Sequence, residues 1–158
     1  MMADGNSKNQ NGFTLMELIL VVAVMGIMAA IAIPSFMALL PAMRVNGAAR
    51  QVMSDLMDAR MEAVKQNHQY KIFVLNDHQY KILDDNDGDG IDDGGGETSR
   101  TVDIQSNYSD VTISYDGSLP TITFSAKGTA PDLDTITLEN SSGSKSVSVS
   151  VAGRVKIE

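Results

Sequence analysis

The sequence of 158 residues contains no cysteine and no tryptophan, and only 5% of its residues are aromatic. Without cysteine the chain can form neither a disulfide nor a thiolate metal site, and it has no thiol nucleophile. With so few aromatic residues, its core must be built from aliphatic and methionine side chains. Basic residues are also in the minority. The formal net charge of −8 argues against a broad electrostatic footprint for nucleic acid.

Residues that could support catalysis are equally sparse. The two histidines, His68 and His78, lie near the two ends of one predicted strand, and no serine stands in a nucleophile-elbow context. The glycines at 94–96 are not followed by Lys-Ser or Lys-Thr, so they do not form a phosphate-binding loop. We therefore expect that this protein is not an enzyme.

Polar side chains are almost absent from residues 13–33. In this run of 21 residues only Thr14 and Glu17 are conventionally polar. A helix rises about 1.5 Å per residue, so this run is long enough to cross a hydrocarbon core of about 30 Å. The sequence predicts a single transmembrane helix here.

Glu17 is out of place in that helix. A charged side chain at the centre of a membrane-spanning helix costs roughly 2.5 to 3.5 kcal/mol on insertion scales, so it usually has a partner. The run offers no lysine, arginine or histidine. The partner must therefore come from another chain or from a new amino terminus. Cleavage after Gly12 would supply such an amine on Phe13, four residues before Glu17.

Residues 12–18, GFTLMEL, resemble the class III signal of type IV prepilins and type II secretion pseudopilins. The shared features are a glycine before the cut, an aromatic first mature residue and a glutamate at the fifth position. The resemblance implies that residues 1–12 are a leader removed by the prepilin peptidase, and that Phe13 is then N-methylated. It also implies that Glu17 docks near the Phe13 amine of a neighbouring subunit, at an inner-membrane assembly platform.

Residues 34–68 are expected to continue the helix as an amphipathic segment. Pro34 and Pro41 each remove a backbone donor, so we expect them to kink or locally melt the helix. Beyond them, apolar residues recur at alternating steps of four and three, which places them on one helical face. These residues are Val45, Ala49, Val52, Leu56, Ala59 and Ala63.

From residue 69 to the end, the hydrophobic period changes from 3.6 to 2. Two alternating segments around Ile72 and Ile82, separated by a turn at 76–78, predict a hairpin. Short strands separated by Gly, Asn, Asp and Ser then predict an α+β protein, in which a long amino-terminal helix precedes a small antiparallel β-sandwich head. The further strands are expected at 101–104, 110–115, 121–124, 135–138, 146–151 and 154–157.

Three segments of this predicted head resemble the GspH/FimT pseudopilins and minor pilins. They are residues 80–97, 122–140 and 147–157, and Tyr80 replaces the tryptophan that is usual in the first of them. The resemblance implies a minor pseudopilin of a type II secretion system that helps drive protein export. The alternative is a minor pilin of a type IV pilus that contributes to DNA uptake. Either would be a single-pass inner-membrane protein with a periplasmic head, and its partners would be other pilin-like helices.

The sharpest cluster in the head is a run of aspartates. Asp85, Asp87 and Asp89 stand at alternate positions and Asp93 at the ninth, as at the start of a calcium loop. The twelfth position is not a glutamate, and Glu97 comes one residue late, so the pattern departs from an EF-hand. The sequence leaves two interpretations open, a Ca²⁺ site and a metal-free solvated loop.

Arg154 and Lys156 form a short basic pattern at the carboxyl terminus. Members of the same family bind DNA through a basic tail of this kind, and residues at alternate positions of a strand project from one face. Affinity for phosphates scales with the number of charges neutralised, and here the cations are few in an acidic chain. Nucleic acid is therefore not expected as the main partner.

Overall fold

The computed structural model describes residues 13–92, 96–116, 121–131 and 133–158. The predicted leader 1–12, which ends at Gly12, lies outside these residues, and so does Asp93. The described chain divides into two compact units, one ending at Leu39 and the other running from Leu40 to Glu158.

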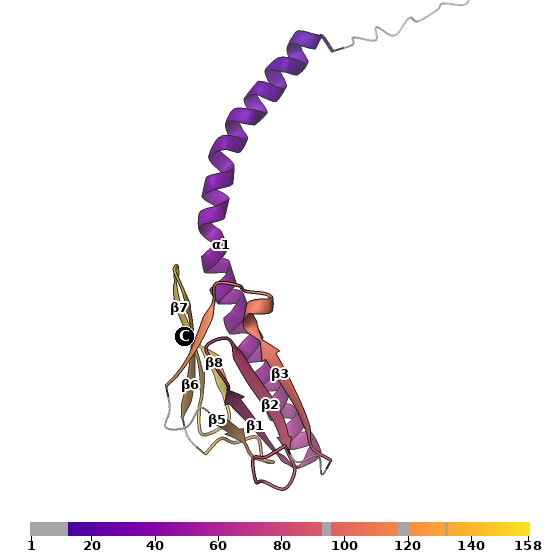
Figure 1. The fold of residues 1–158 in the computed structure, drawn as a ribbon, viewed down its shortest axis with the longest axis vertical. Helices are drawn as coiled ribbons and strands as arrows, with labels where there is room; N and C mark the ends of the chain where they lie inside the picture. The colour runs from indigo at the N-terminus through magenta and orange to yellow at the C-terminus, as the bar shows by residue number, and fades with distance from the viewer. Residues whose placement is uncertain (1–12, 93–95, 117–120, 132) are drawn as a thin grey trace, which may run out of the picture. The chain divides into compact units, whose positions relative to one another are not determined.

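A single helix, α1, runs from Leu15 to Gln66 (Figure 1). Thr14 caps its amino terminus, because the Thr14 hydroxyl oxygen accepts a hydrogen bond from the backbone N–H of Glu17 at 3.2 Å, the usual arrangement at a helix amino terminus. The helix ends where Asn67 adopts the left-handed conformation at φ 60°. The N–H of His68 then caps the carbonyl of Ala63 at 3.2 Å.

The local melting expected at Pro34 and Pro41 does not occur, because α1 is helical across both positions. Each proline lacks a backbone N–H, so the carbonyl four residues earlier loses its usual helical hydrogen bond. The adjoining turns keep their own hydrogen bonds, and the hydroxyl of Ser35 adds one to the carbonyl of Ile31 at 3.2 Å. Each proline therefore weakens the helix locally without ending it, and the expected kink stays a prediction.

The first unit contains the apolar part of α1. Its most apolar window has a mean hydropathy of 2.6, and none of that window is buried within this chain. By length and composition, this helix could cross a membrane. Its apolar side chains need lipid or other helices to cover them.

The second unit is built from two antiparallel sheets of four strands. The first sheet has the order β3-β2-β1-β5 and the second the order β4-β6-β7-β8. The first contains β1 (Gln69–Val74), β2 (Gln79–Asp85), β3 (Thr98–Asp103) and β5 (Thr121–Phe124). The second contains β4 (Thr112–Asp116), β6 (Asp134–Asn140), β7 (Gly143–Val149) and β8 (Val155–Ile157). A short 3₁₀ helix, Ile104–Ser106, follows β3.

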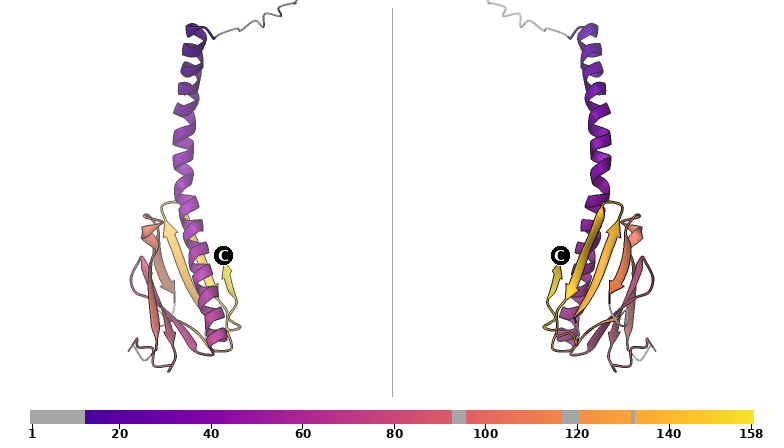
Figure 2. Two further views of the ribbon diagram at one scale, coloured as in Figure 1. Left: turned by 90° about the vertical axis from the view of Figure 1, so that its right-hand side faces the viewer. Right: turned by 90° about the vertical axis from the view of Figure 1, so that its left-hand side faces the viewer.

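The two sheets share one hydrophobic core with α1. The two views of Figure 2 show the part of α1 within this unit running along the sheets. All six residues of the predicted apolar face are buried, together with Ala48. From the strands, Ile72, Phe124 and Leu138 are each at most 1% exposed. The predicted fold class, a long helix followed by an antiparallel two-sheet head, is confirmed.

Candidate functional site

Phe13 and Glu17 lie at the amino-terminal end of the described chain. Phe13 precedes the first turn of α1 and is 83% exposed, and Glu17 lies within that turn. The side chain of Glu17 makes no hydrogen bond or ion pair with any described residue of this chain. A carboxylate without a partner on a strongly apolar helix is expected to find one on another chain.

The aspartate-rich loop follows β2, which continues through Asp84 and Asp85 and buries both, so that the first residue of the predicted calcium pattern, Asp85, lies on the strand. One carboxylate oxygen of Asp85 accepts hydrogen bonds from the backbone N–H groups of Gly88 at 3.2 Å and Gly90 at 3.1 Å. Asp87 and Asp89 make similar turns. The side chain of Asp87, for example, accepts a hydrogen bond from the backbone N–H of Asp89 at 3.0 Å. These local bonds fix the shape of the loop.

The loop brings three of the four predicted metal ligands together. Asp85, Asp87 and Asp89 each offer one carboxylate oxygen, and these oxygens lie within 4.8 Å of one another. Calcium binds oxygens at about 2.3 to 2.6 Å, so two of its ligands lie at most about 5 Å apart. The spacing is therefore compatible with a calcium ion, while the fourth predicted ligand, Asp93, lies outside the described residues.

A lysine on the neighbouring strand already supplies a positive charge to this loop. The ammonium nitrogen of Lys71 lies 2.5 Å from Asp85 Oδ2, and it donates a hydrogen bond to the carbonyl of Gly88 at 3.1 Å. Asp85 is fully buried and the Lys71 side chain is only 15% exposed. Calcium binding remains a prediction, testable by calorimetry, and it requires Lys71 to leave Asp85.

The ion pair predicts an acid-sensitive contribution to stability. Burial by itself raises the pKa of Asp85, but Lys71 and the N–H groups of Gly90 and Gly88 outweigh it and hold the pKa below its ordinary value. A carboxyl with a lowered pKa stabilises the fold above its unfolded pKa of about 3.9, and that stability is lost as the pH falls through the folded pKa.

We therefore expect Asp85→Asn to lower the free energy of unfolding at pH 7 by about 3 kcal/mol, because it leaves the Lys71 ammonium without its partner. The loss should shrink as the pH falls below the unfolded pKa of about 3.9, toward pH 3, because protonation of the unfolded carboxyl then begins to cancel the advantage of the folded ion pair. All four tyrosines lie beyond residue 69, so tyrosine fluorescence during urea unfolding of the full chain in detergent reports on this unit. The exposed Asp89→Asn is the control. An equal loss from Asp85→Asn at both pH values would contradict the assignment.

Asp55 joins α1 to the first sheet, a contact that the sequence did not suggest. Its two carboxylate oxygens accept hydrogen bonds from different strands, one from Arg100 Nη2 at 3.0 Å and the other from the hydroxyl of Tyr80. Tyr80 is 1% exposed, and burial, followed by Asp55, raises the pKa of its hydroxyl well above the ordinary value. The tyrosine that replaces the usual tryptophan of this segment thus has a polar partner of its own.

The basic residues at the carboxyl terminus are both exposed. Lys156 lies within 2.7 Å of the Glu158 carboxylate, so part of its charge is already balanced. Arg154 precedes β8, beside Gly153, whose φ of 73° belongs to the turn between β7 and β8. Lys145 lies on the neighbouring strand β7, where its register partner on β6 is Leu138.

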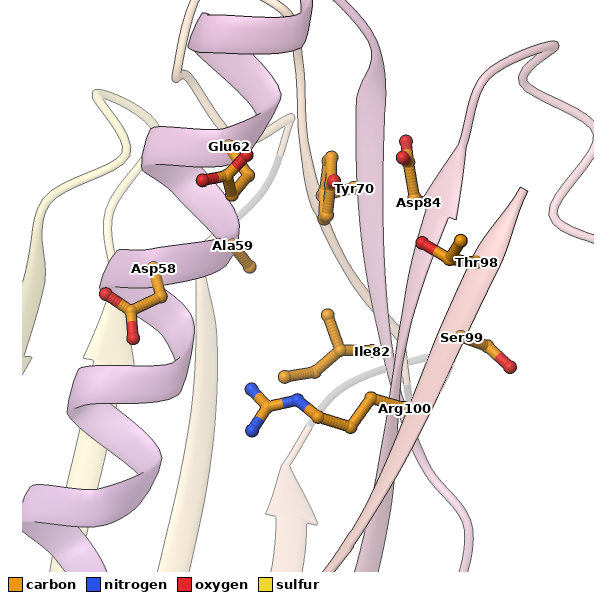
Figure 3. Close-up of a pocket in the computed structure, with 9 residues that line it drawn as sticks. All are labelled: Asp58, Ala59, Glu62, Tyr70, Ile82, Asp84, Thr98, Ser99 and Arg100. Carbon is orange, nitrogen blue, oxygen red and sulfur yellow. The ribbon is translucent and has the colours of Figure 1, made fainter. Parts of the chain in front are cut away.

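A cavity of about 300 Å³ lies between α1 and the first sheet, and it carries a second group of acidic side chains (Figure 3). Asp58 and Glu62 of α1 and Asp84 of β2 are among its lining residues, and Figure 3 shows the carboxylate of Asp58 on the side of the helix away from the sheet. No local pattern in the sequence predicted this grouping, because the residues come from two elements that are distant in the chain. Only the packing of the helix on the sheet brings them to one place.

Two family profiles match the sequence. The family described as type II transport protein GspH matches residues 48–153, and the prokaryotic N-terminal methylation motif matches residues 7–33. No curated protein sequence matches the chain.

Solved structures give further matches. The crystal structure of the type IV minor pilin FimU from Pseudomonas aeruginosa is 25% identical, with a TM-score of 0.57 over 72% of this chain and 87% of FimU. The solution structure of Escherichia coli GspH is 13% identical, with a TM-score of 0.49 over 73% of this chain and 88% of that protein.

Proposed function

Since this chain belongs to the GspH family of type II transport proteins, we propose that it is a minor pseudopilin of a type II secretion system. In this role it assembles through α1 into a periplasmic pseudopilus that helps to drive protein export. The observation that carries the proposal is the order of the two matches, a methylation motif over residues 7–33 followed by the GspH family over residues 48–153.

The proposed mechanism is assembly without catalytic turnover. The prepilin peptidase removes residues 1–12 after Gly12 and the amine of Phe13 is methylated, while α1 waits in the inner membrane with its head in the periplasm. At the assembly platform, Glu17 pairs with the terminal amine of a neighbouring subunit. This pairing is supported by the exposed apolar surface of the first unit, and by the lack of a partner for Glu17 among the described residues of its own chain.

A minor pilin of a type IV pilus is the second candidate. It is favoured by the similarity to FimU, which at 25% identity extends over 72% of this chain. A contribution to DNA uptake gains little support from the carboxyl terminus, because Glu158 lies against one of its two cations and phosphate binding depends on the number of free charges.

Deleting the gene separates the two candidates. If the protein is a pseudopilin, the deletion strain should retain its type II substrates in the periplasm, while its surface pili and its uptake of labelled DNA stay at the parental level. Immunoblots of medium and periplasm, together with sheared pili, measure both outcomes, and a plasmid copy should restore export. Normal export combined with loss of pili would reject the pseudopilin assignment in favour of the minor pilin.

A further inference from the structure

Glu97 is buried beside the aspartate-rich loop, and half of its carboxylate is unused. The side chain is only 8% exposed. Its Oε1 accepts a hydrogen bond from the backbone N–H of Asn86 at 3.1 Å, whereas the buried Oε2 has no hydrogen-bond partner among the described residues. Because a buried acceptor without a donor is costly, such an atom points to an ion or a water molecule.

The fold returns Glu97 to the start of the loop. The pairing of β2 with β3 ends at Asp84 opposite Thr98, and Glu97 immediately precedes Thr98 in the chain. The N–H that its Oε1 accepts belongs to Asn86, the residue directly after Asp85. In an EF-hand, a glutamate at the twelfth position completes the ligand set. Glu97 is one residue late in the sequence, yet in the structure it bonds to the first turn of the loop.

Lys71 marks the oxygens that a cation uses at this loop. Its ammonium nitrogen lies 2.5 Å from Asp85 Oδ2 and 3.1 Å from the carbonyl oxygen of Gly88. Carboxylate oxygens and backbone carbonyls are both ligands of calcium. The ammonium group therefore occupies a place where a calcium ion would find two of its ligands.

One ammonium group does not balance the charge of the loop. Asp87, Asp89 and Glu97 form no ion pair with any described residue. Asp87 and Asp89 are exposed, but Glu97 is buried. An open groove of about 520 Å³ is lined in part by Asp85 and Asp87, which gives a dissolved ion a path to the loop. A divalent ion would neutralise more of this charge than Lys71 does.

We propose that the loop binds one Ca²⁺ ion, that Glu97 completes the site, and that Lys71 competes with the ion. The three clustered aspartates supply carboxylate oxygens, and Lys71 releases Asp85 Oδ2 and the carbonyl of Gly88. Glu97 Oε2 binds the ion directly or through a water molecule, as one position of calcium loops does. Ca²⁺ accepts six to eight oxygens in flexible geometry, whereas Mg²⁺ demands a near-ideal octahedron. The inference is independent of the proposed function, because it needs neither a filament nor a partner.

Calorimetry of the full-length chain in detergent tests the site. The protein is first freed of metal with a chelator and then titrated at pH 7 with CaCl₂ or, in a second run, with MgCl₂. We expect one Ca²⁺ per chain, with a dissociation constant on the order of 10⁻⁴ to 10⁻³ M, the range of extracellular calcium modules. Mg²⁺ should bind more weakly.

Glu97→Gln should weaken Ca²⁺ binding by about tenfold or more, the usual effect of removing a supporting group from a metal site. Glu139→Gln is the matched control, because Glu139 is exposed on β6 and its loss removes the same charge outside the loop. It should leave the dissociation constant unchanged. Tyrosine fluorescence during urea unfolding checks that both variants stay folded.

Lys71→Met should instead tighten Ca²⁺ binding by about tenfold or more, because the ion no longer has to break the pair with Asp85. Lys65→Met is its control, since Lys65 is exposed on α1. An affinity of Lys71→Met equal to that of the wild type would contradict the competition. Should Lys71→Met fail to fold without calcium, the comparison of Glu97→Gln with Glu139→Gln still decides the inference.

The outcomes are distinct from those of the proposed function, which the gene deletion tests. No binding at millimolar CaCl₂, Mg²⁺ binding as tight as that of Ca²⁺, or an unchanged affinity in Glu97→Gln would each overturn the calcium site and leave the proposed function standing. Binding of one Ca²⁺ that is weakened by Glu97→Gln and not by Glu139→Gln supports the site.

Discussion

Glu17→Ala should leave the protein in the membrane but remove it from filaments. Alanine avoids the insertion cost of roughly 2.5 to 3.5 kcal/mol of a charged residue at the centre of the membrane, so anchoring should not suffer. Assembly should suffer, because the methylated amine of Phe13 on the neighbouring subunit would be buried without its carboxylate. Breaking a buried ion pair costs about 3 kcal/mol or more, which corresponds to about a hundredfold in an association constant.

The measurement compares the share of the protein in the filament fraction with the share in membranes. Thr14→Ala is the control, since it changes the other polar residue of the same apolar run and keeps the carboxylate. Intact mass of the membrane-extracted protein should show in both variants that the chain begins at Phe13, so that failed cleavage does not mimic failed assembly. Wild-type incorporation of Glu17→Ala would reject the proposed pairing.

Gly153→Ala should strongly destabilise the head. Gly153 has a φ of 73°, where a residue with a Cβ is strained by about 1 to 2 kcal/mol. In addition, a Cβ built at this position would lie 1.8 Å from the carbonyl oxygen of Gly128 and 2.9 Å from Arg60 Nε. Arg60 Nε itself donates to that carbonyl at 2.8 Å, so neither the backbone nor the arginine can yield without losing a hydrogen bond.

Together the strain and the overlap should lower the free energy of unfolding by several kcal/mol. That free energy is typically only about 5 to 15 kcal/mol for a protein. Gly88→Ala is the control, because Gly88 has a similar φ of 88° and no heavy atom lies within 4 Å of its added Cβ. Gly88→Ala should lower the free energy of unfolding only by the backbone strain, about 1 to 2 kcal/mol. Urea unfolding followed by tyrosine fluorescence compares the two. Equal destabilisation by both substitutions would show that the close approach to Gly128 is unimportant.

The sequence predicted the features of this fold that have a regular period. The buried face of α1 repeats at helical spacing, and the valines of the last hairpin alternate, so residues such as Leu56 and Val149 could be placed in the core without coordinates. The membrane run and Glu17 were equally visible, because a charge in a long apolar segment is conspicuous.

Contacts between distant side chains could not be predicted in the same way. Asp55 and Tyr80 are 25 residues apart and Asp55 and Arg100 are 45 apart, and no local pattern links them. Asp85 was expected to begin a calcium loop, yet β2 carries both Asp84 and Asp85 into buried positions. The melting expected at the prolines was wrong because the loss of one donor does not outweigh the turns on either side.

The position of Lys71 has a consequence for the conditions that the head can tolerate. A dissolved ion can be stripped by a chelator or diluted away, whereas this ammonium group is attached to β1 by its own covalent side chain and stays 2.5 Å from Asp85. In the proposed pseudopilin the head would lie in the periplasm, where the concentrations of small ions change with the surroundings. Asp85 therefore keeps a counter-charge whatever the concentration of dissolved ions around the loop.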